Sequence, residues 1–225
     1  MIRSRLFQRV LLAIGVALLA GCATQPGYDY TAFRESRPKS ILVLPPLNDS
    51  PDVNATYSMY AQTTVPLAES GYYVLPVTLV DEAFRQNGLT SPADIQQVPL
   101  KKLYEIFGAD TALYIKVTHY GTKYLIISSE TRVSAEAKLV DLRSGATLWE
   151  GTATASSEEG NNNSGGGVVG LLLKAVITQI ADTLSNRGHP IAGITASRLL
   201  SAGRPNGILY GPRSPKYQKD GSPAP

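Results

Sequence analysis

The sequence predicts one α/β (α+β) domain, a three-layer sandwich in which helices cover both faces of a mixed sheet. Three observations lead to this fold class. Short continuous apolar runs alternate with helical segments up to residue 110, a two-residue period begins at Thr111, and a strongly apolar helical segment follows at Val168–Leu184. A chain with 43% hydrophobic residues can bury one core of this size, so residues 40–202 are expected to form a single domain.

The first part of this domain predicts two buried strands with a helix between them. Ile41–Leu44 and Tyr72–Val77 are continuous apolar runs, typical of strands that are buried on both faces. Asn54–Glu69 predicts the intervening helix. Pro66 should weaken or kink it, because proline cannot donate the backbone hydrogen bond of a helix interior.

Further helices are expected before the period changes. Thr78 with Asp81 three residues later resembles a capping box at a helix start, with aspartate in place of the usual glutamate. A second start signal follows at Ser91–Asp94. Leu100–Phe107 should be a helix with an apolar stripe formed by Leu103, Ile106 and Phe107.

The two-residue period predicts an antiparallel meander of four strands. Apolar and polar side chains alternate along Leu113–Thr118 and along Arg132–Leu139, as in half-exposed strands. Tyr124–Ser128 and Ala146–Ser156 supply the other two strands. The turn residues Asp141–Gly145 supply the last reversal.

Two helices and a tail should complete the chain. Val168–Leu184 is apolar nearly all round, so it is buried either in the core of this domain or against another copy or another lipoprotein. Ile191–Leu200 predicts a last helix. Residues 203–225 are rich in glycine and proline and lack apolar periodicity, which predicts a tail that is weakly ordered or docked.

The N-terminus has the layout of a secretory signal peptide, expected at residues 1–21. A basic start (Arg3, Arg5, Arg9) precedes an apolar run of 11 residues, Val10–Ala20. As a helix this run would reach about 16 Å, well short of the roughly 30 Å hydrocarbon core of a bilayer. It is therefore suited to removal, and residues 22–39 read as a polar tether between the cleavage site and the domain.

Leu19-Ala20-Gly21-Cys22 resembles a bacterial lipobox, in which the cysteine becomes the first mature residue and is acylated. Cys22 is the only cysteine and is the predicted lipid attachment site. Two or three acyl chains, such as palmitate, make a stable anchor, whereas one does not. Ala23 stands where inner-membrane retention would typically use aspartate, which favours the outer membrane. An ordinary signal with a stray or buried thiol is the alternative.

The charge balance gives no support to nucleic-acid or anionic-lipid binding. The chain has 21 basic and 18 acidic residues, and three arginines before Cys22 account for the whole excess. The mature chain is therefore formally neutral, and the high overall pI belongs to the export signal.

No catalytic, cofactor-binding or metal-binding residues are predicted, and the chain is not expected to be an enzyme. His119 falls in phase with Leu113 and Val117, as a core or edge histidine would, and His189 precedes a proline at a helix junction. Two histidines are too few for a nitrogen-rich metal site. Gly165–Gly170 lacks the Gly-Lys-Ser/Thr ending of a phosphate-binding loop and reads as a hinge. An enzyme would need His119 beside an acid and a nucleophile.

Five segments in order resemble a family of bacterial outer-membrane lipoproteins of unknown function, which includes a meningococcal surface-antigen candidate. They are Ile41–Pro46, Ser91–Ile95, Phe107–Asp110, Val140–Trp149 and Gly211–Pro215. Members of the family are often encoded beside lipoproteins similar to the curli secretion channel. The resemblance implies a fold similar to the N-terminal domain of the Tol-Pal periplasmic component. It supplies no catalytic residues.

The leading hypothesis is a non-enzymatic module, anchored in the outer membrane through acylated Cys22 and facing the periplasm. Its expected partner is another copy or a neighbouring envelope lipoprotein, in envelope assembly or export. Whether any part reaches the cell surface stays open. The alternative is a ligand-binding or regulatory lipoprotein that contacts peptidoglycan or its synthases, which would need a groove with converging polar groups.

Overall fold

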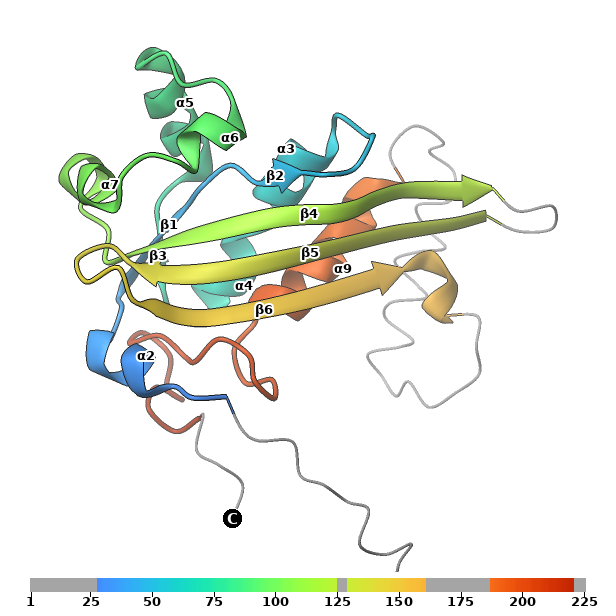
Figure 1. Ribbon diagram of the computed structural model, residues 1–225. Helices are drawn as coiled ribbons and strands as arrows, with labels where there is room; N and C mark the ends of the chain where they lie inside the picture. Colours follow the sequence, from blue (N-terminus) through green and yellow to red (C-terminus); the bar gives the residue numbers. More distant parts are fainter. Residues whose placement is uncertain (1–27, 125–128, 161–186, 221–225) are drawn as a thin grey trace, which may run out of the picture.

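A computed structural model of the chain describes residues 28–124, 129–160 and 187–220. In this part of the chain, helices lie on both faces of one mixed sheet, which confirms the predicted fold class (Figure 1). The signal peptide, Cys22, the Gly165–Gly170 hinge and the Val168–Leu184 helix were all predicted from sequence. They lie outside the described residues.

The sheet has the strand order β3-β1-β4-β5-β6, and β2 pairs separately with β4. β1 is parallel to β3 and β4, whereas β4, β5 and β6 are antiparallel, so the sheet is mixed as predicted. The predicted buried strand at residues 72–77 is shorter than expected and lies at an edge, where Tyr73 is half exposed. The strands are β1 (Ser40–Val43), β2 (Leu47–Asn48), β3 (Tyr73–Val74), β4 (Thr111–Tyr124), β5 (Ser129–Asp141) and β6 (Thr147–Ser156).

The described meander has three strands, where the sequence predicted four. The strand expected at Leu113–Thr118 continues to Tyr124 as β4, and residues 125–128 of the next expected strand lie outside the described residues. A β-bulge shifts the pairing with β5 between Val117 and His119. The bulge interrupts the two-residue alternation and so resembles a strand end in the sequence.

The described helices are α2 (Thr31–Ser36), α3 (Ala55–Ala61), α4 (Thr64–Glu69), α5 (Val77–Gln86), α6 (Pro92–Ile95), α7 (Leu100–Phe107) and α9 (Gly188–Leu200), with a 3₁₀ turn at Ser157–Gly160. The break expected near Pro66 falls earlier, between α3 and α4, one turn before the residue that cannot donate. The predicted capping box is wrong. α5 begins at Val77 and has no side-chain cap, which leaves Thr78 inside the helix.

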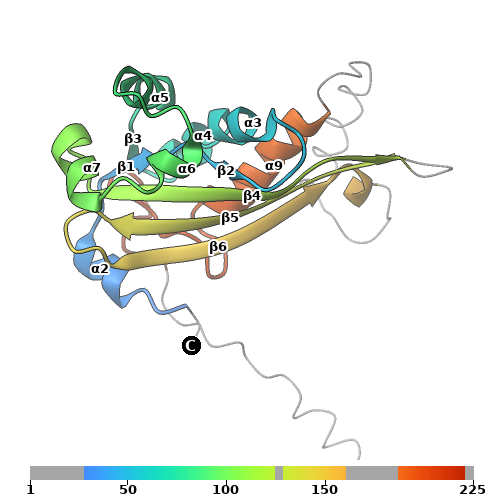
Figure 2. The same ribbon diagram turned by 45° about the horizontal axis from the view of Figure 1, so that its top comes forward.

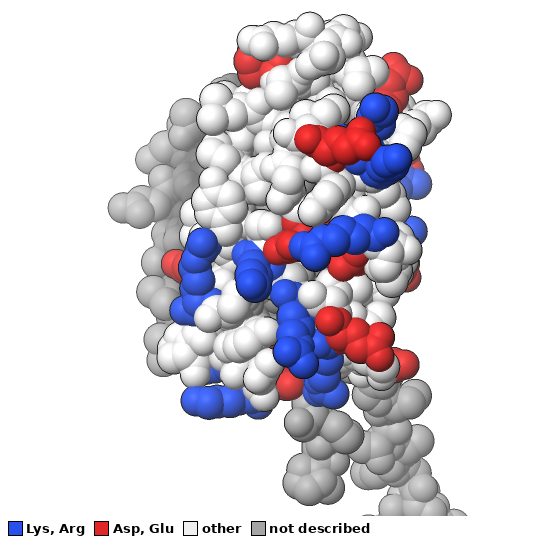
Figure 3. Space-filling model, turned by 90° about the vertical axis from the view of Figure 1, so that its left-hand side faces the viewer, with Lys and Arg blue, Asp and Glu red and all other residues white. Residues whose placement is uncertain are grey.

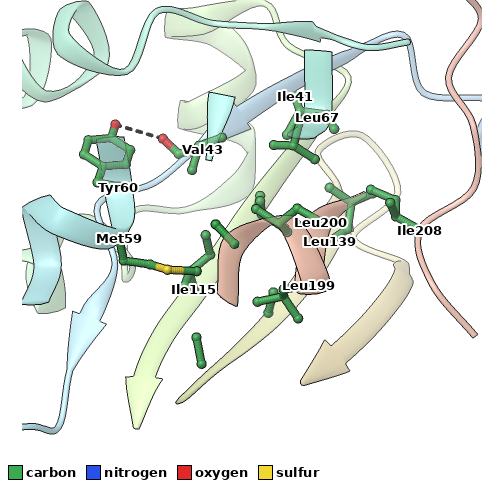
Figure 4. Close-up of a cluster of buried hydrophobic side chains, with 14 of the residues drawn as sticks. Ile41, Val43, Met59, Tyr60, Leu67, Ile115, Leu139, Leu199, Leu200 and Ile208 are labelled. Carbon is green, nitrogen blue, oxygen red and sulfur yellow. Dashed lines mark hydrogen bonds between the residues drawn. The ribbon is translucent and has the colours of Figure 1, made fainter. Parts of the chain in front are cut away.

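Two hydrophobic clusters lie on opposite faces of the sheet. The larger holds side chains from α3, α4 and α9 against β1, β4 and β5 (Figure 4). The smaller lies under α5, α6 and α7. Ile41 and Val43 of β1 enter the larger cluster, whereas Leu42 and Leu44 enter the smaller. The continuous apolar run at 41–44 thus serves both faces, as predicted.

Both ends of the described chain pack against this core. The tether was expected to extend to Lys39, but residues 31–36 form α2, and Tyr30 and Phe33 are buried in the larger cluster. Burial raises the pKa of Tyr30 to about 12, and its hydroxyl donates to the Gly207 carbonyl at 2.5 Å. The C-terminal segment is docked, since Ile208 and Leu209 are buried in the larger cluster.

Candidate interaction site

His119 does not lie where its sequence phase predicts. Because of the bulge, Tyr120 continues the buried row of Ile115 and Val117, and His119 lies half-buried on the other face of β4. It pairs across the sheet with Ser134. The placement in phase with Leu113 was therefore wrong, since a bulge inverts the facing of every residue after it.

His189 lies in a hydrogen-bonded group at the start of α9. Its Nδ1 is 2.9 Å from Ser58 Oγ and its Nε2 is 2.8 Å from Gln62 Nε2, both on or beside α3. The Tyr120 hydroxyl donates to the same Ser58 Oγ at 2.9 Å. These contacts join α9 to α3 and β4. Within the described ranges, no three histidine, cysteine or acidic side chains are grouped as metal ligands would be.

Two of the sequence segments that carry the family resemblance meet at one end of the sheet. Asp110, which precedes β4, accepts hydrogen bonds from the backbone nitrogens of Lys39 and Ser40 at 2.9 and 3.1 Å. It also forms an ion pair with Arg143 of the β5–β6 turn. The Arg143 guanidinium lies 5.5 Å from the centre of the Tyr104 ring of α7. These two segments therefore have a structural role here, because Asp110 links the start of β1 to the β5–β6 turn.

Asp141 is a buried carboxylate in the same turn. Its oxygens accept hydrogen bonds from Ser36 Oγ at 2.5 Å and from the backbone nitrogens of Arg143 and Ser144 at 2.9 and 2.8 Å. Burial opposes its ionisation, but these donors favour the charged form more strongly, so the pKa of Asp141 lies below its usual value. The carboxylate fixes the turn and ties α2 to it.

Asp141→Asn should destabilise the fold at neutral pH by roughly 1–3 kcal/mol, since the amide nitrogen would face donors. A lowered folded-state pKa means that the wild-type contribution is complete above the unfolded pKa, near 4, and is lost as the pH falls through the folded pKa. Urea unfolding at pH 7 and pH 3 should show a smaller acid loss in the variant. Equal acid losses would contradict this assignment, and Ser36→Ala should give an intermediate slope.

An exposed apolar groove lies between the β3 edge, α5 and α7. Its volume is about 320 Å³, and its lining includes Tyr73, Leu75, Leu79 and Phe107. Leu79 is 66% exposed and Tyr73 is 47% exposed, although both are large apolar side chains. Clusters of this kind on a surface mark interaction sites.

The apolar stripe predicted on α7 is only partly buried. Leu103 is fully buried and Phe107 lines the groove, whereas Ile106 is 60% exposed and lies outside the groove lining. Leu79 lies one residue before buried Val80 and so points about 100° away from it around α5. Val80 and Phe84 are four residues apart and share the buried face of α5, and Leu79 does not fit that spacing. A large apolar residue outside the buried face is the sequence signal that could have indicated the groove.

A second groove lies on the outer face of the sheet, and both apolar and charged side chains line it. No described helix covers this face of β5 and β6, while α9 packs on the opposite face (Figure 2). The groove has a volume of about 670 Å³, and charges of both signs line it: Lys116, Glu136, Lys138 and Glu150. The Lys116 ammonium lies 2.6 Å from Asp49, whose hydrogen bond and charge raise the lysine pKa. Cross-strand charges of mixed sign suit binding of a polar ligand.

The described part of the chain forms no helix with the length and apolar character that a bilayer span requires.

Two solved structures resemble this chain to different degrees, and the first agrees with the fold. The crystal structure of lipoprotein GNA1162 from Neisseria meningitidis is similar to this chain, with 55% sequence identity and a TM-score of 0.53. The match covers 65% of this chain and 100% of that one. The C-terminal domain of LpoB from Salmonella enterica is 17% identical, covers 62% of this chain and 90% of its own, and has a TM-score of 0.38.

Sequence comparison is more specific. The chain is 52% identical over 206 residues to "Putative lipoprotein NMB1124/NMB1162" of Neisseria meningitidis serogroup B, which covers 91% of this chain and 95% of that protein. Residues 28–213 match the family "Putative lipoprotein GNA1162-like". The chain therefore belongs to the GNA1162-like lipoprotein family.

Proposed function

We propose that this protein is a non-enzymatic outer-membrane lipoprotein that binds another copy of itself or a neighbouring envelope lipoprotein, in envelope assembly or export. Residues 1–21 act as the signal peptide, and acylated Cys22 anchors a domain that faces the periplasm. Membership of a lipoprotein family supports the anchor, and so does the lipobox at Leu19–Cys22. The proposal for binding rests on the apolar groove beside β3.

The apolar groove favours a protein partner. An isolated exposed leucine is ordinary, but Leu79 and Tyr73 line one hollow together with partly buried Leu75 and Phe107. β3 is the edge strand here, and an edge leaves backbone donors and acceptors free to pair with a partner. Anchoring confines the protein to two dimensions, which raises its effective concentration, so a modest interface is sufficient.

Leu79→Glu tests this interface against a matched control, Val53→Glu. Val53 is 84% exposed and lies outside the groove, so both changes place a carboxylate on an exposed apolar position. Chemical crosslinking in whole cells, followed by blue-native electrophoresis of detergent extracts, should show a complex that Leu79→Glu weakens at least tenfold and Val53→Glu leaves intact. A strictly monomeric wild type, or equal effects of the two variants, would argue against the proposal.

The anchor has its own test. Mass spectrometry of the mature protein should find acyl chains on Cys22, and Cys22→Ser should release the chain from the outer-membrane fraction. Stable anchoring requires more than one acyl chain, and Cys22→Ser removes all of them. The variant should therefore move from the membrane fraction to the soluble fraction. A bare thiol would overturn the anchor.

The charged side chains of the groove on the outer sheet face favour a second candidate, a lipoprotein that contacts peptidoglycan or its synthases. Lys116, Glu136 and Glu150 converge there over a concave surface. Co-sedimentation with purified sacculi tests this function. Binding that Glu136→Lys weakens and Leu79→Glu spares would favour it over the assembly role.

A further inference from the structure

The neutral mature chain is electrically polarised in the fold. Two segments, residues 28–39 and 201–220, together carry seven basic residues and three acidic ones. The rest of the described chain carries ten basic residues and fourteen acidic ones. The seven are Arg34, Arg37, Lys39, Arg204, Arg213, Lys216 and Lys219, and all are exposed. We call this surface the basic end.

These two segments, far apart in sequence, form one end of the molecule. The backbone nitrogen of Tyr28 donates to Asn206 Oδ1 at 3.1 Å, and the Tyr30 hydroxyl donates to the Gly207 carbonyl. α2 and the C-terminal segment also line a common cavity of about 270 Å³. Figure 3 shows lysines and arginines gathered over the lower half of this side of the molecule, where α2 and the C-terminal segment lie in Figure 1.

Six of the seven cations of the basic end have no carboxylate within ion-pair distance in the part of the chain that the structure describes. Within the described ranges, Arg37, Lys39 and the four cations of residues 201–220 form no ion pair, whereas seven of the ten cations elsewhere do. Arg213 and Lys216 instead lie over the rings of Tyr73 and Tyr210, each 5.4 Å from the ring centre. Such contacts hold a cation in place and leave its charge available.

The same end lies next to the proposed anchor. Five residues separate Cys22 from Tyr28, the first described residue, so the span between them is at most about 20 Å when fully extended. Tyr28 is held at the basic end by its bond to Asn206. An acylated Cys22 would therefore keep this end, rather than α5 or α7, close to the membrane surface.

We propose that the basic end rests on the anionic phospholipid headgroups of the membrane that holds Cys22, and so sets the orientation of the domain. This inference rests on the proposed lipid anchor. Each exposed cation near an anionic bilayer strengthens binding about fivefold, over a range of about 8 Å at physiological salt.

Vesicle binding of the mature chain with Cys22→Ser tests the contact without the lipid. The anchor-free protein should co-sediment with vesicles of phosphatidylethanolamine and phosphatidylglycerol, bind much less in 0.5 M salt, and ignore phosphatidylcholine vesicles. The triple variant Arg204→Glu, Arg213→Glu, Lys216→Glu should lose about 100-fold in affinity. Its matched control, Lys101→Glu, Lys102→Glu, Lys138→Glu, has the same charge change on other surfaces and should lose little.

Equal losses in the two triple variants, or wild-type binding that ignores salt and lipid charge, would overturn the inference. Thermal melts of both variants establish that they are folded. A labelled Lys219→Cys variant of the acylated protein supplies a second measurement, because Cys22 is the only native cysteine. Lipid-borne quenchers should reach this label and not one at Ile106→Cys. A bare Cys22 thiol would refute the anchor alone, since the vesicle assay does not depend on it.

Discussion

Gly71→Ala should destabilise the fold by about 3 kcal/mol or more, because two costs meet at this residue. Gly71 has φ +98°, which L side chains rarely adopt, and a Cβ there would lie 2.6 Å from the backbone nitrogen of Ser214 and 2.8 Å from the carbonyl oxygen of Gly211. The C-terminal segment is hydrogen-bonded at this point, from Gly211 to Ser70 and from Arg213 to Gly71, at 2.8 and 3.1 Å. An alanine forces the two backbones apart.

Two further substitutions separate these costs. Gly88→Ala has a similar φ of +79° but no atom within 4 Å of the new Cβ, so it should cost only about 1 kcal/mol. At Gly211 the Cβ would lie 2.5 Å from the Gly71 carbonyl oxygen, so Gly211→Ala isolates the clash. Urea unfolding gives the free energies. The emission of Trp149, the only tryptophan, reports docking of the segment. A Gly88→Ala cost equal to that of Gly71→Ala would contradict the steric argument.

Sequence patterns predicted the elements that are determined by residues close together in the chain. The run Ile41–Leu44 predicted a strand buried on both faces, and the α7 bounds followed from Pro99 before Leu100 and from Gly108, which ends the helix in the left-handed conformation. The bulge after Val117 could not be predicted in this way, because it exists only in the pairing with β5.

Docking of the C-terminal segment depends on distant residues and leaves no period in the sequence. Ile208 and Leu209 form only a short apolar pair near glycines and prolines, yet Ile208 lies in the same buried cluster as Leu139 and Leu200 (Figure 4). The candidate sites also differ in whether the sequence alone reveals them. Cys22 belongs to a contiguous motif that sequence reveals, whereas exposed Leu79 is recognised only when its neighbours on β3 and α7 are placed.

Trp149→Ala should cost about 4 kcal/mol, as removal of a large buried aromatic side chain does. Trp149 of β6 is 1% exposed, and its ring lies against Gly151 so closely that a Cβ there would be 2.3 Å from the ring. Its indole nitrogen donates to the Asn206 carbonyl at 3.0 Å. The side chain therefore joins the sheet to the C-terminal segment as well as filling the core.

Trp149→Phe separates these two roles, because it keeps most of the apolar ring and loses the donor. Asn206 is exposed, so water can replace the lost bond, and the cost should be about 1 kcal/mol. Urea unfolding measures both variants. Limited proteolysis with trypsin should cut after exposed Arg213 much faster in Trp149→Ala than in Trp149→Phe, because only the alanine variant removes the surface on which the segment packs. Equal costs and equal cleavage would mean that the hydrogen bond, rather than burial of the ring, holds the segment.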